Sequence, residues 1–212
     1  VTDGHIMEGQ LKCSGCSHQF PIVRGVPRFA DLERIDEEKA ATASSFGYEW
    51  KHFTQEDPKY VQQLLGWIDP VKPEFFTGKV VLDAGCGKAR HTQLAATWGA
   101  RDVIGIDLSD AVESAYAATR DFENAHVVQG DICQMPLAPV FDYAFSLGVL
   151  DHLGNPVSGF ESLASKVKPG GHVSAWVYGA ENNKWITGII NPVRVHFTSR
   201  LHPRTLFYVS EL

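Results

Sequence analysis

Three aspartates at the ends of apolar stretches are the residues of this sequence best suited to binding a polar ligand. Asp83 is followed closely by Gly85 and Gly87, which allow a tight turn and a close approach of the backbone to a ligand. Asp107 can accept hydrogen bonds from both hydroxyls of a ribose, and Asp131 can accept one from the exocyclic amine of a base. Because ligands bind beyond the carboxyl ends of parallel strands, the three aspartates together predict an adenosine site.

The glycine turn decides between two cofactors that contain adenosine. A nicotinamide dinucleotide requires the spacing Gly-x-Gly-x-x-Gly, which lets its pyrophosphate lie at a helix N-terminus. The sequence has instead Gly85-Cys86-Gly87-Lys88-Ala89-Arg90. A carboxylate at Asp83 would repel a pyrophosphate, whereas it would attract the amine or the sulfonium of S-adenosylmethionine. The turn therefore favours S-adenosylmethionine, with Leu108 and Ile132 on either side of the adenine.

Alternating strands and helices must position these residues. Apolar stretches that read as buried strands occur at 79–83, 103–107, 125–129, 141–147 and 172–178. Residues at helical spacing follow the first, second and fourth of these stretches. This rhythm is typical of right-handed βαβ crossovers. We therefore expect an α/β fold, with a Rossmann-like parallel sheet and helices on both of its faces.

Composition and charge limit the classes of protein to which this chain can belong. The chain has 212 residues, 44% of them hydrophobic, and a formal net charge of -6. This length suits one α/β domain with an appendage. The acidic balance argues against a nucleic-acid partner, because phosphate binding needs clustered Lys and Arg. The sequence shows no secretory segment and no apolar run of about 18 residues, which predicts a cytoplasmic protein.

The order of the patterns predicts four parts of the chain. Residues 1–30 form a small β appendage, 31–77 a linker and a helical lid, 78–178 the cofactor-binding core, and 179–212 a C-terminal segment. The aromatic cluster around Tyr48 lies in the lid, and we assign Tyr48 to the cofactor, because aromatic side chains supply apolar cover with a polar tip. The alternative is a helix that packs its aromatic side chains on the core.

Cys13 and Cys16 form the only CxxC pair of the sequence. A CxxC loop between two short strands is the usual zinc knuckle, in which both thiolates point at one ion. Tetrahedral zinc takes four ligands, and His5 and His18 can complete the set, although their spacing does not require it. Cys13 and Cys16 are therefore candidate ligands of Zn2+. The alternative is a pair of free or disulfide-linked thiols.

Residues 78–178 resemble the class I S-adenosylmethionine-dependent methyltransferases. The resemblance rests on five motifs in the order of that family: Val81-Leu82-Asp83-Ala84-Gly85-Cys86-Gly87, Val103-Ile104-Gly105-Ile106-Asp107-Leu108-Ser109, Gln129-Gly130-Asp131-Ile132, the segment from Phe141 to Leu153, and Lys168-Pro169-Gly170-Gly171. One such motif is weak evidence, whereas five in order are specific. The resemblance covers about half of the chain.

The resemblance also assigns a part of the cofactor to each motif. The residues it implies are Asp83, Gly85 and Gly87 at the methionine end, Cys86 next to the cofactor as a small packing residue, Asp107 at the ribose, Leu108, Asp131 and Ile132 at the adenine, and Leu147 beside the sulfonium. Ala89 stands where many members have a third glycine, and we expect its methyl group to be accommodated with a negative φ. Members of the family usually add two antiparallel strands after the fifth strand. We expect this pair to be missing here.

Residues 11–27 resemble the second half of a Trm112-like zinc-ribbon domain, with a CxxC, an apolar segment and Gly-Val-Pro. The first CxxC of that family would precede Val1, so the resemblance implies half a ribbon. The chain begins with Val rather than Met, and we expect it to be trimmed. The C-terminal segment mixes basic and aromatic side chains, which suits either a capping helix or a surface that touches substrate or membrane.

His152 is the best candidate for a general base, because it follows the fourth strand, where an acceptor would lie, and titrates in the right range. Asp151 can orient His152 or bind an amine of the substrate. The alternative is a histidine that shapes the loop through hydrogen bonds to the backbone.

These patterns predict a methyltransferase that acts on an oxygen, nitrogen or carbon atom of a small-molecule acceptor. Two alternatives are open. The first is a methyltransferase fold without activity that serves as a binding or regulatory module. The second is an RNA methyltransferase that uses the N-terminal ribbon as a reader, against which the acidic balance argues.

Overall fold

The computed structural model describes residues 4–30, 42–44, 47 and 59–179. The chain divides into two units, Val1–Trp176 and Val177–Leu212, and every helix and strand given below lies in the first. Tyr48 and about half of the residues predicted as linker and lid fall outside the described residues, as does the segment after residue 179. The role of Tyr48 and the missing strand pair therefore stay predictions.

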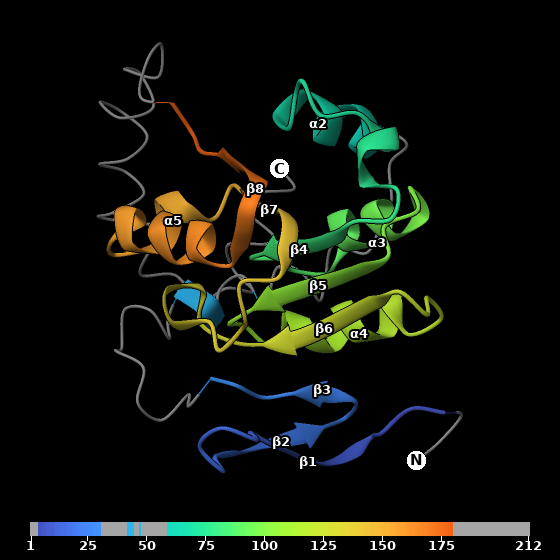
Figure 1. Ribbon diagram of the computed structural model, residues 1–212, viewed down its shortest axis with the longest axis vertical. Coiled ribbons are helices and arrows are strands. Elements are labelled where there is room, and N and C mark those ends of the chain that lie inside the picture. Colours follow the sequence, from blue (N-terminus) through green and yellow to red (C-terminus); the bar gives the residue numbers. More distant parts are fainter. Residues whose placement is uncertain (1–3, 31–41, 45–46, 48–58, 180–212) are drawn as a thin grey trace, which may run out of the picture. The chain divides into compact units, whose positions relative to one another are not determined.

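A five-stranded parallel sheet forms the centre of the first unit (Figure 1). Its strands, in the order of the sheet, are β6 (Ala125–Gln129), β5 (Asp102–Asp107), β4 (Val80–Ala84), β7 (Phe141–Leu147) and β8 (Val167–Trp176). The strand order reverses between β4 and β7, so the carboxyl end of β4 lies at the switch point where ligands of such sheets bind. The expected α/β class is confirmed.

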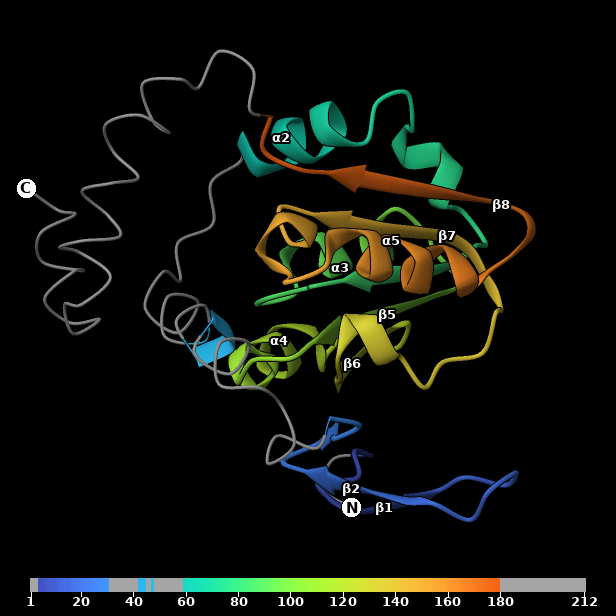
Figure 2. The ribbon, with the colours of Figure 1, turned by 90° about the vertical axis from the view of Figure 1, so that its left-hand side faces the viewer.

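Helices cover both faces of this sheet (Figure 2), which is why all five residues of β4 are buried. One face carries α2 (Lys59–Trp67), η2 (Pro73–Phe76), α3 (Arg90–Thr97) and α4 (Ala111–Thr119). The other face carries η3 (Ile132–Gln134), η4 (Leu150–His152) and α5 (Pro156–Ser165). This division follows from right-handed crossovers that run in opposite directions from β4. None of the described helices has the length and apolar character needed to cross a bilayer.

The last strand begins earlier than the sequence predicts. We expected it to start at His172, because Pro169-Gly170-Gly171 reads as a breaker, but β8 already begins at Val167. Val167 pairs with Phe141, and the register then shifts before His172 pairs with Tyr143. The shift accommodates the proline and the two glycines without ending the strand.

The N-terminal residues form a small antiparallel sheet beside β6 (Figure 1). Its strands are β1 (Glu8–Lys12), β2 (Gln19–Val23) and β3 (Val26–Pro27). Val26 is fully buried in one cluster with Val112 and Val127, and Arg28 makes an isolated parallel bridge to Gln129. The appendage therefore shares a hydrophobic core with the edge of the main sheet.

Candidate functional site

The glycine turn after β4 is held against β5 by its backbone. The amide groups of Gly85 and Cys86 both donate to the carbonyl of Ile106, at 2.7 and 3.1 Å. Gly85 has a φ of 85°, and a Cβ there would lie 2.4 Å from Cγ2 of Val149. Cys86 is buried, which suits its expected role as a small packing residue and raises the pKa of its thiol. The turn thus needs glycine for both conformation and space.

Ala89 differs from the sequence prediction. Its φ is 66° rather than negative, and its side chain is fully buried. The residue lies at the N-terminus of α3, where the amide of Ala89 donates to the carbonyl of Cys86 at 2.8 Å. The turn therefore imposes the left-handed conformation on whatever residue stands there, at a cost of about 1–2 kcal/mol for alanine.

Asp107 joins the turn after β4 to the loop after β5. Its Oδ2 accepts from the amide of Gly87 at 2.8 Å, and its Oδ1 accepts from the amide and the hydroxyl of Ser109 at 2.8 and 2.7 Å. A carboxylate has about four lone-pair positions, so three are in use. Asp107 can accept one further hydrogen bond from a ribose hydroxyl, and a second requires the hydroxyl of Ser109 to turn away.

Asp83 lies beneath the turn rather than on its surface. Its side chain is 2% exposed, and its Oδ2 accepts a hydrogen bond from the hydroxyl of Thr92 at 2.7 Å. Burial raises the pKa of Asp83 to about 7, although the hydrogen bond from Thr92 opposes the shift. Asp83 can therefore act on a cationic ligand through its charge, with the turn between them.

Asp131, the third aspartate of the predicted cofactor site, lies at the start of η3. Oδ1 of Asp131 accepts from the amide of Cys133 at 2.8 Å, which fixes the loop after β6. Ile132 and Leu147 are buried, whereas Leu108 is partly exposed at the end of β5. The carboxyl ends of β4, β5, β6 and β7 thus bring the predicted cofactor residues that the structure describes to one edge of the sheet.

His152 and Asp151 lie in η4, just past the end of β7. The distance from Nε2 of His152 to Oδ2 of Asp151 is 3.7 Å, which is longer than a hydrogen bond. Both side chains are partly exposed, at 33% and 25%. The pair is accessible to an acceptor, but Asp151 does not hold the imidazole in a fixed orientation.

Several aromatic side chains that were not predicted as site residues lie near the glycine turn. Trp67 of α2 stacks on Trp176 at the end of β8, with 4.5 Å between ring centroids, and the edge of His91 meets Trp67 at 5.9 Å. Burial lowers the pKa of His91 to about 3, so its imidazole is neutral. The guanidinium of Arg90 lies 3.8 Å from the ring centroid of Tyr60. No periodic signal in the sequence relates these positions, because the contacts join distant segments.

The two predicted zinc ligands lie on the turn between β1 and β2. Hydrogen bonds from the backbone of Cys16 and Gly15 lower the pKa of the Cys13 thiol. Within the part of the chain that the structure describes, no group of three or more His, Cys, Asp or Glu side chains is placed so that it could hold a metal ion. Two thiols alone do not make a tetrahedral site, so the predicted Zn2+ is not supported.

Comparison with known proteins agrees with this geometry. Residues 82–175 match a family model described as a methyltransferase domain. One chain of a solved complex that contains the Haloferax volcanii Trm112 methyltransferase activator is 25% identical to this chain. The match covers 78% of this chain and 76% of the other, with a TM-score of 0.51. It also shares the fold of Haemonchus contortus phosphoethanolamine N-methyltransferase 1, with a TM-score of 0.54, 17% identity, and coverage of 70% of this chain and 34% of that one.

Curated relatives include two bacterial proteins named tRNA U34 carboxymethyltransferase. That of Pseudoalteromonas translucida (strain TAC 125) is 35% identical over 52% of this chain and 34% of its own length. That of Psychromonas ingrahamii is 32% identical over 57% of this chain and 37% of its own length. The chain thus spans about a third of the length of these relatives.

These names contradict our expectation of a small-molecule acceptor without a nucleic-acid partner. The expectation rested on a net charge of -6, which is a sum over the whole chain and says nothing about local concentrations of charge. The domain assignment agrees with the strand order, the glycine turn and the acidic residues at the carboxyl edge. Residues 82–175 therefore match a methyltransferase-domain model, and the parallel sheet that contains them has the fold of class I methyltransferases.

Proposed function

We propose that this chain is an S-adenosylmethionine-dependent methyltransferase that acts on RNA, and on tRNA in particular. The observation that carries the proposal is the position of Asp107. Its carboxylate bonds to the turn after β4 and to the loop after β5, and it keeps one acceptor position for a ribose hydroxyl. This arrangement suits a nucleoside at the edge where the family model matches.

The residues at this edge fit each part of the cofactor. Asp107 would hold the ribose, while Leu108, Asp131 and Ile132 would surround the adenine. The negative field of Asp83 would attract the α-amine, and Leu147, the last residue of β7, would line the sulfonium. When bound, the cofactor supplies an electrophilic methyl group on its sulfonium sulfur. The protein then contributes mainly by positioning the two reactants.

The acceptor is inferred from the relatives named as tRNA-modifying enzymes. The sequence contains positive charge in spite of its acidic total, since Arg194, Arg200 and Arg204 occur in one short stretch of the C-terminal sequence. Clustered arginines are what binding to phosphates requires. That segment lies outside the described residues, so its contribution is a matter for experiment.

His152 serves as general base where the acceptor atom must lose a proton. It lies past the end of β7, and its side chain is partly exposed to an incoming substrate. Where the acceptor atom carries a free lone pair, no base is needed and His152 only lines the site.

The test uses the full chain, S-adenosylmethionine labelled in its methyl group, and unmodified tRNA. We expect label in the RNA fraction, with loss of the signal in Asp107→Ala. Mass spectrometry of the digested nucleosides then shows whether the added group is a methyl group, which is the only one-carbon group that S-adenosylmethionine supplies in this assay. Cofactor binding without transfer to tRNA, but with transfer to small acceptors, would refute the RNA assignment. Absence of cofactor binding would refute the methyltransferase assignment itself.

A further inference from the structure

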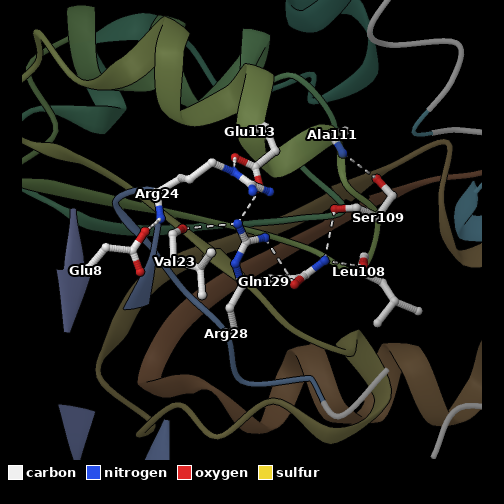
Figure 3. Close-up of polar contacts among 9 residues, drawn as sticks. All are labelled: Glu8, Val23, Arg24, Arg28, Leu108, Ser109, Ala111, Glu113 and Gln129. Carbon is white, nitrogen blue, oxygen red and sulfur yellow. Dashed lines mark hydrogen bonds and ion pairs between the residues drawn. The ribbon is translucent and has the colours of Figure 1, made fainter. Parts of the chain in front are cut away.

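Gln129, the last residue of β6, connects three parts of the molecule (Figure 3). Its side chain is buried, with 3% exposure, and all of its side-chain hydrogen-bonding groups are used. Oε1 accepts from Nη1 of Arg28 at 3.1 Å. Nε2 donates to the carbonyls of Leu108 and Ser109 at 3.1 and 3.5 Å. The amide can adopt only this orientation, because a rotated amide would place its NH2 group against the guanidinium.

Arg28 belongs to the N-terminal segment, yet its side chain is only 11% exposed. Besides Gln129, its guanidinium bonds to Glu113 of α4 and to the carbonyl of Val23 at 3.1 Å. The backbone adds a second link, since the amide of Phe29 donates to the carbonyl of Gln129 at 2.7 Å. Arg28 is therefore fixed by the N-terminal sheet and fixes Gln129 in turn.

The network continues from Gln129 to the carboxylate of Asp107, which is the predicted ligand of the ribose. The carbonyl groups of Leu108 and Ser109 receive the amide of Gln129, and the amide and hydroxyl of Ser109 both donate to Oδ1 of Asp107. The hydroxyl of Ser109 also accepts from the amide of Ala111, which opens α4. Each link is a hydrogen bond between part-buried or buried groups, where such bonds are least weakened by water.

We propose that the N-terminal sheet positions the adenosine side of the cofactor pocket, with Arg28 acting through Gln129 on the 108–109 loop and so on Asp107. Arg28 and Gln129 are positioning residues, since neither is in the predicted pocket. The inference rests on the proposed function, because it assumes that the pocket takes adenosine. The N-terminal segment thus contributes to the pocket through Arg28, and this contribution does not depend on Cys13 or Cys16.

The decisive variant is Gln129→Glu, because it separates the two sides of the network. A glutamate still accepts from Arg28, so the contact to the N-terminal sheet is kept. It cannot donate to the carbonyls of Leu108 and Ser109, and its charge repels them. We expect the dissociation constant of S-adenosylhomocysteine to rise about tenfold at a temperature where the variant is folded. The melting temperature should also fall, because the new carboxylate is buried against two carbonyl groups.

Arg28→Leu tests the other side and should weaken binding to a similar degree. Arg28→Lys should restore part of the affinity, since an ammonium can still reach one acceptor. Arg24→Ala is the matched control, because Arg24 bonds to Glu113 but not to Gln129. Its side chain is 66% exposed, and Arg28 keeps its own bond to Glu113 when Arg24 is removed, so we expect no change in the dissociation constant.

Calorimetric titration of the full chain at a temperature where every variant is folded gives the readout. 5′-Methylthioadenosine, which lacks the amino-acid part, should lose affinity by the same factor as S-adenosylhomocysteine. Unchanged binding in Gln129→Glu and Arg28→Leu would overturn the proposal, and so would an equal loss in Arg24→Ala. If the unaltered chain binds neither ligand, the proposed function fails as well, which separates the two failures.

Discussion

The hydroxyl of Thr92, in the first turn of α3, donates a hydrogen bond to the buried carboxylate of Asp83, with 2.7 Å between Oγ1 and Oδ2. The bond favours the ionised acid, but burial outweighs it and raises the pKa of Asp83 to about 7. Near neutral pH, Asp83 is therefore divided between its two protonation states until a cation approaches the turn.

Cofactor affinity should consequently depend on pH. A positively charged α-amine favours the ionised carboxylate, so binding of S-adenosylhomocysteine should strengthen roughly tenfold from about pH 6 to pH 8 as Asp83 loses its proton. Calorimetry across this range measures the change. 5′-Methylthioadenosine has no amine and should show little dependence. Asp83→Asn should remove the dependence for both ligands, and a rise that persists in this variant would assign the effect to another group.

The same variant should make the cofactor-free protein more stable at alkaline pH. The folded state raises the pKa of Asp83 from 3.8 to about 7, so the folded state binds the proton more tightly than the unfolded state. The free energy of unfolding therefore falls as pH rises from about 4 to 7, by up to about 4 kcal/mol. Asparagine carries no charge and still accepts from Thr92. Chemical denaturation at pH 8 should show Asp83→Asn to be the more stable protein, although it binds the cofactor less well.

The strands and their acidic ends are predictable from the sequence because they depend on local patterns. β6 and β7 have the predicted bounds, and β4 is displaced by one residue. The left-handed conformation of Ala89 is not predictable, since the surrounding turn imposes it against the preference of alanine. The contact between Arg28 and Gln129 joins residues 101 positions apart, and a single sequence holds no signal for such a pair. The acceptor was misjudged for a different reason, because net charge describes the whole chain and not a surface.

Gly85→Ala should weaken cofactor binding through a defined clash. The added methyl group would lie 2.4 Å from Cγ2 of Val149, and the φ of 85° is unfavourable for any residue with a Cβ. Val149 precedes η4, so its displacement would also move the loop that holds His152. We expect at least a tenfold loss of affinity for S-adenosylhomocysteine by calorimetry. Val149→Ala in the same chain should relieve the clash but not the strain, and should recover only part of the loss.

His152→Gln should separate a base from a structural residue. A base that removes a proton in the transition state contributes about 10²- to 10⁴-fold to the rate. We expect the turnover number for tRNA to fall in that range, with unchanged binding of S-adenosylhomocysteine. Asp151→Asn should have a smaller effect, because its carboxylate lies 3.7 Å from the imidazole. Equal losses of binding and rate in His152→Gln would instead indicate that His152 shapes the loop.

The attachment of the N-terminal sheet should be sensitive to acid. Arg24 and Arg28 both pair with Glu113, and the hydrogen bond from Arg24 is the main cause that holds the pKa of Glu113 below its usual value of 4.5. A lowered pKa in the folded state means that the stabilisation is complete above pH 4.5 and is lost as pH falls below it. Hydrogen exchange of β1, β2 and β3 should therefore accelerate in acid before the exchange of β4 does.

Glu113→Gln should show fast exchange in the N-terminal sheet already at neutral pH. We expect the substitution to cost about 1 kcal/mol or slightly more, since the side chain of Glu113 is only partly buried. Glu161→Gln, on the exposed side of α5, is the control and should leave the exchange unchanged. If the N-terminal sheet and β4 exchange together at every pH, the sheet is held by the hydrophobic contacts of Val26 and not by the ion pairs.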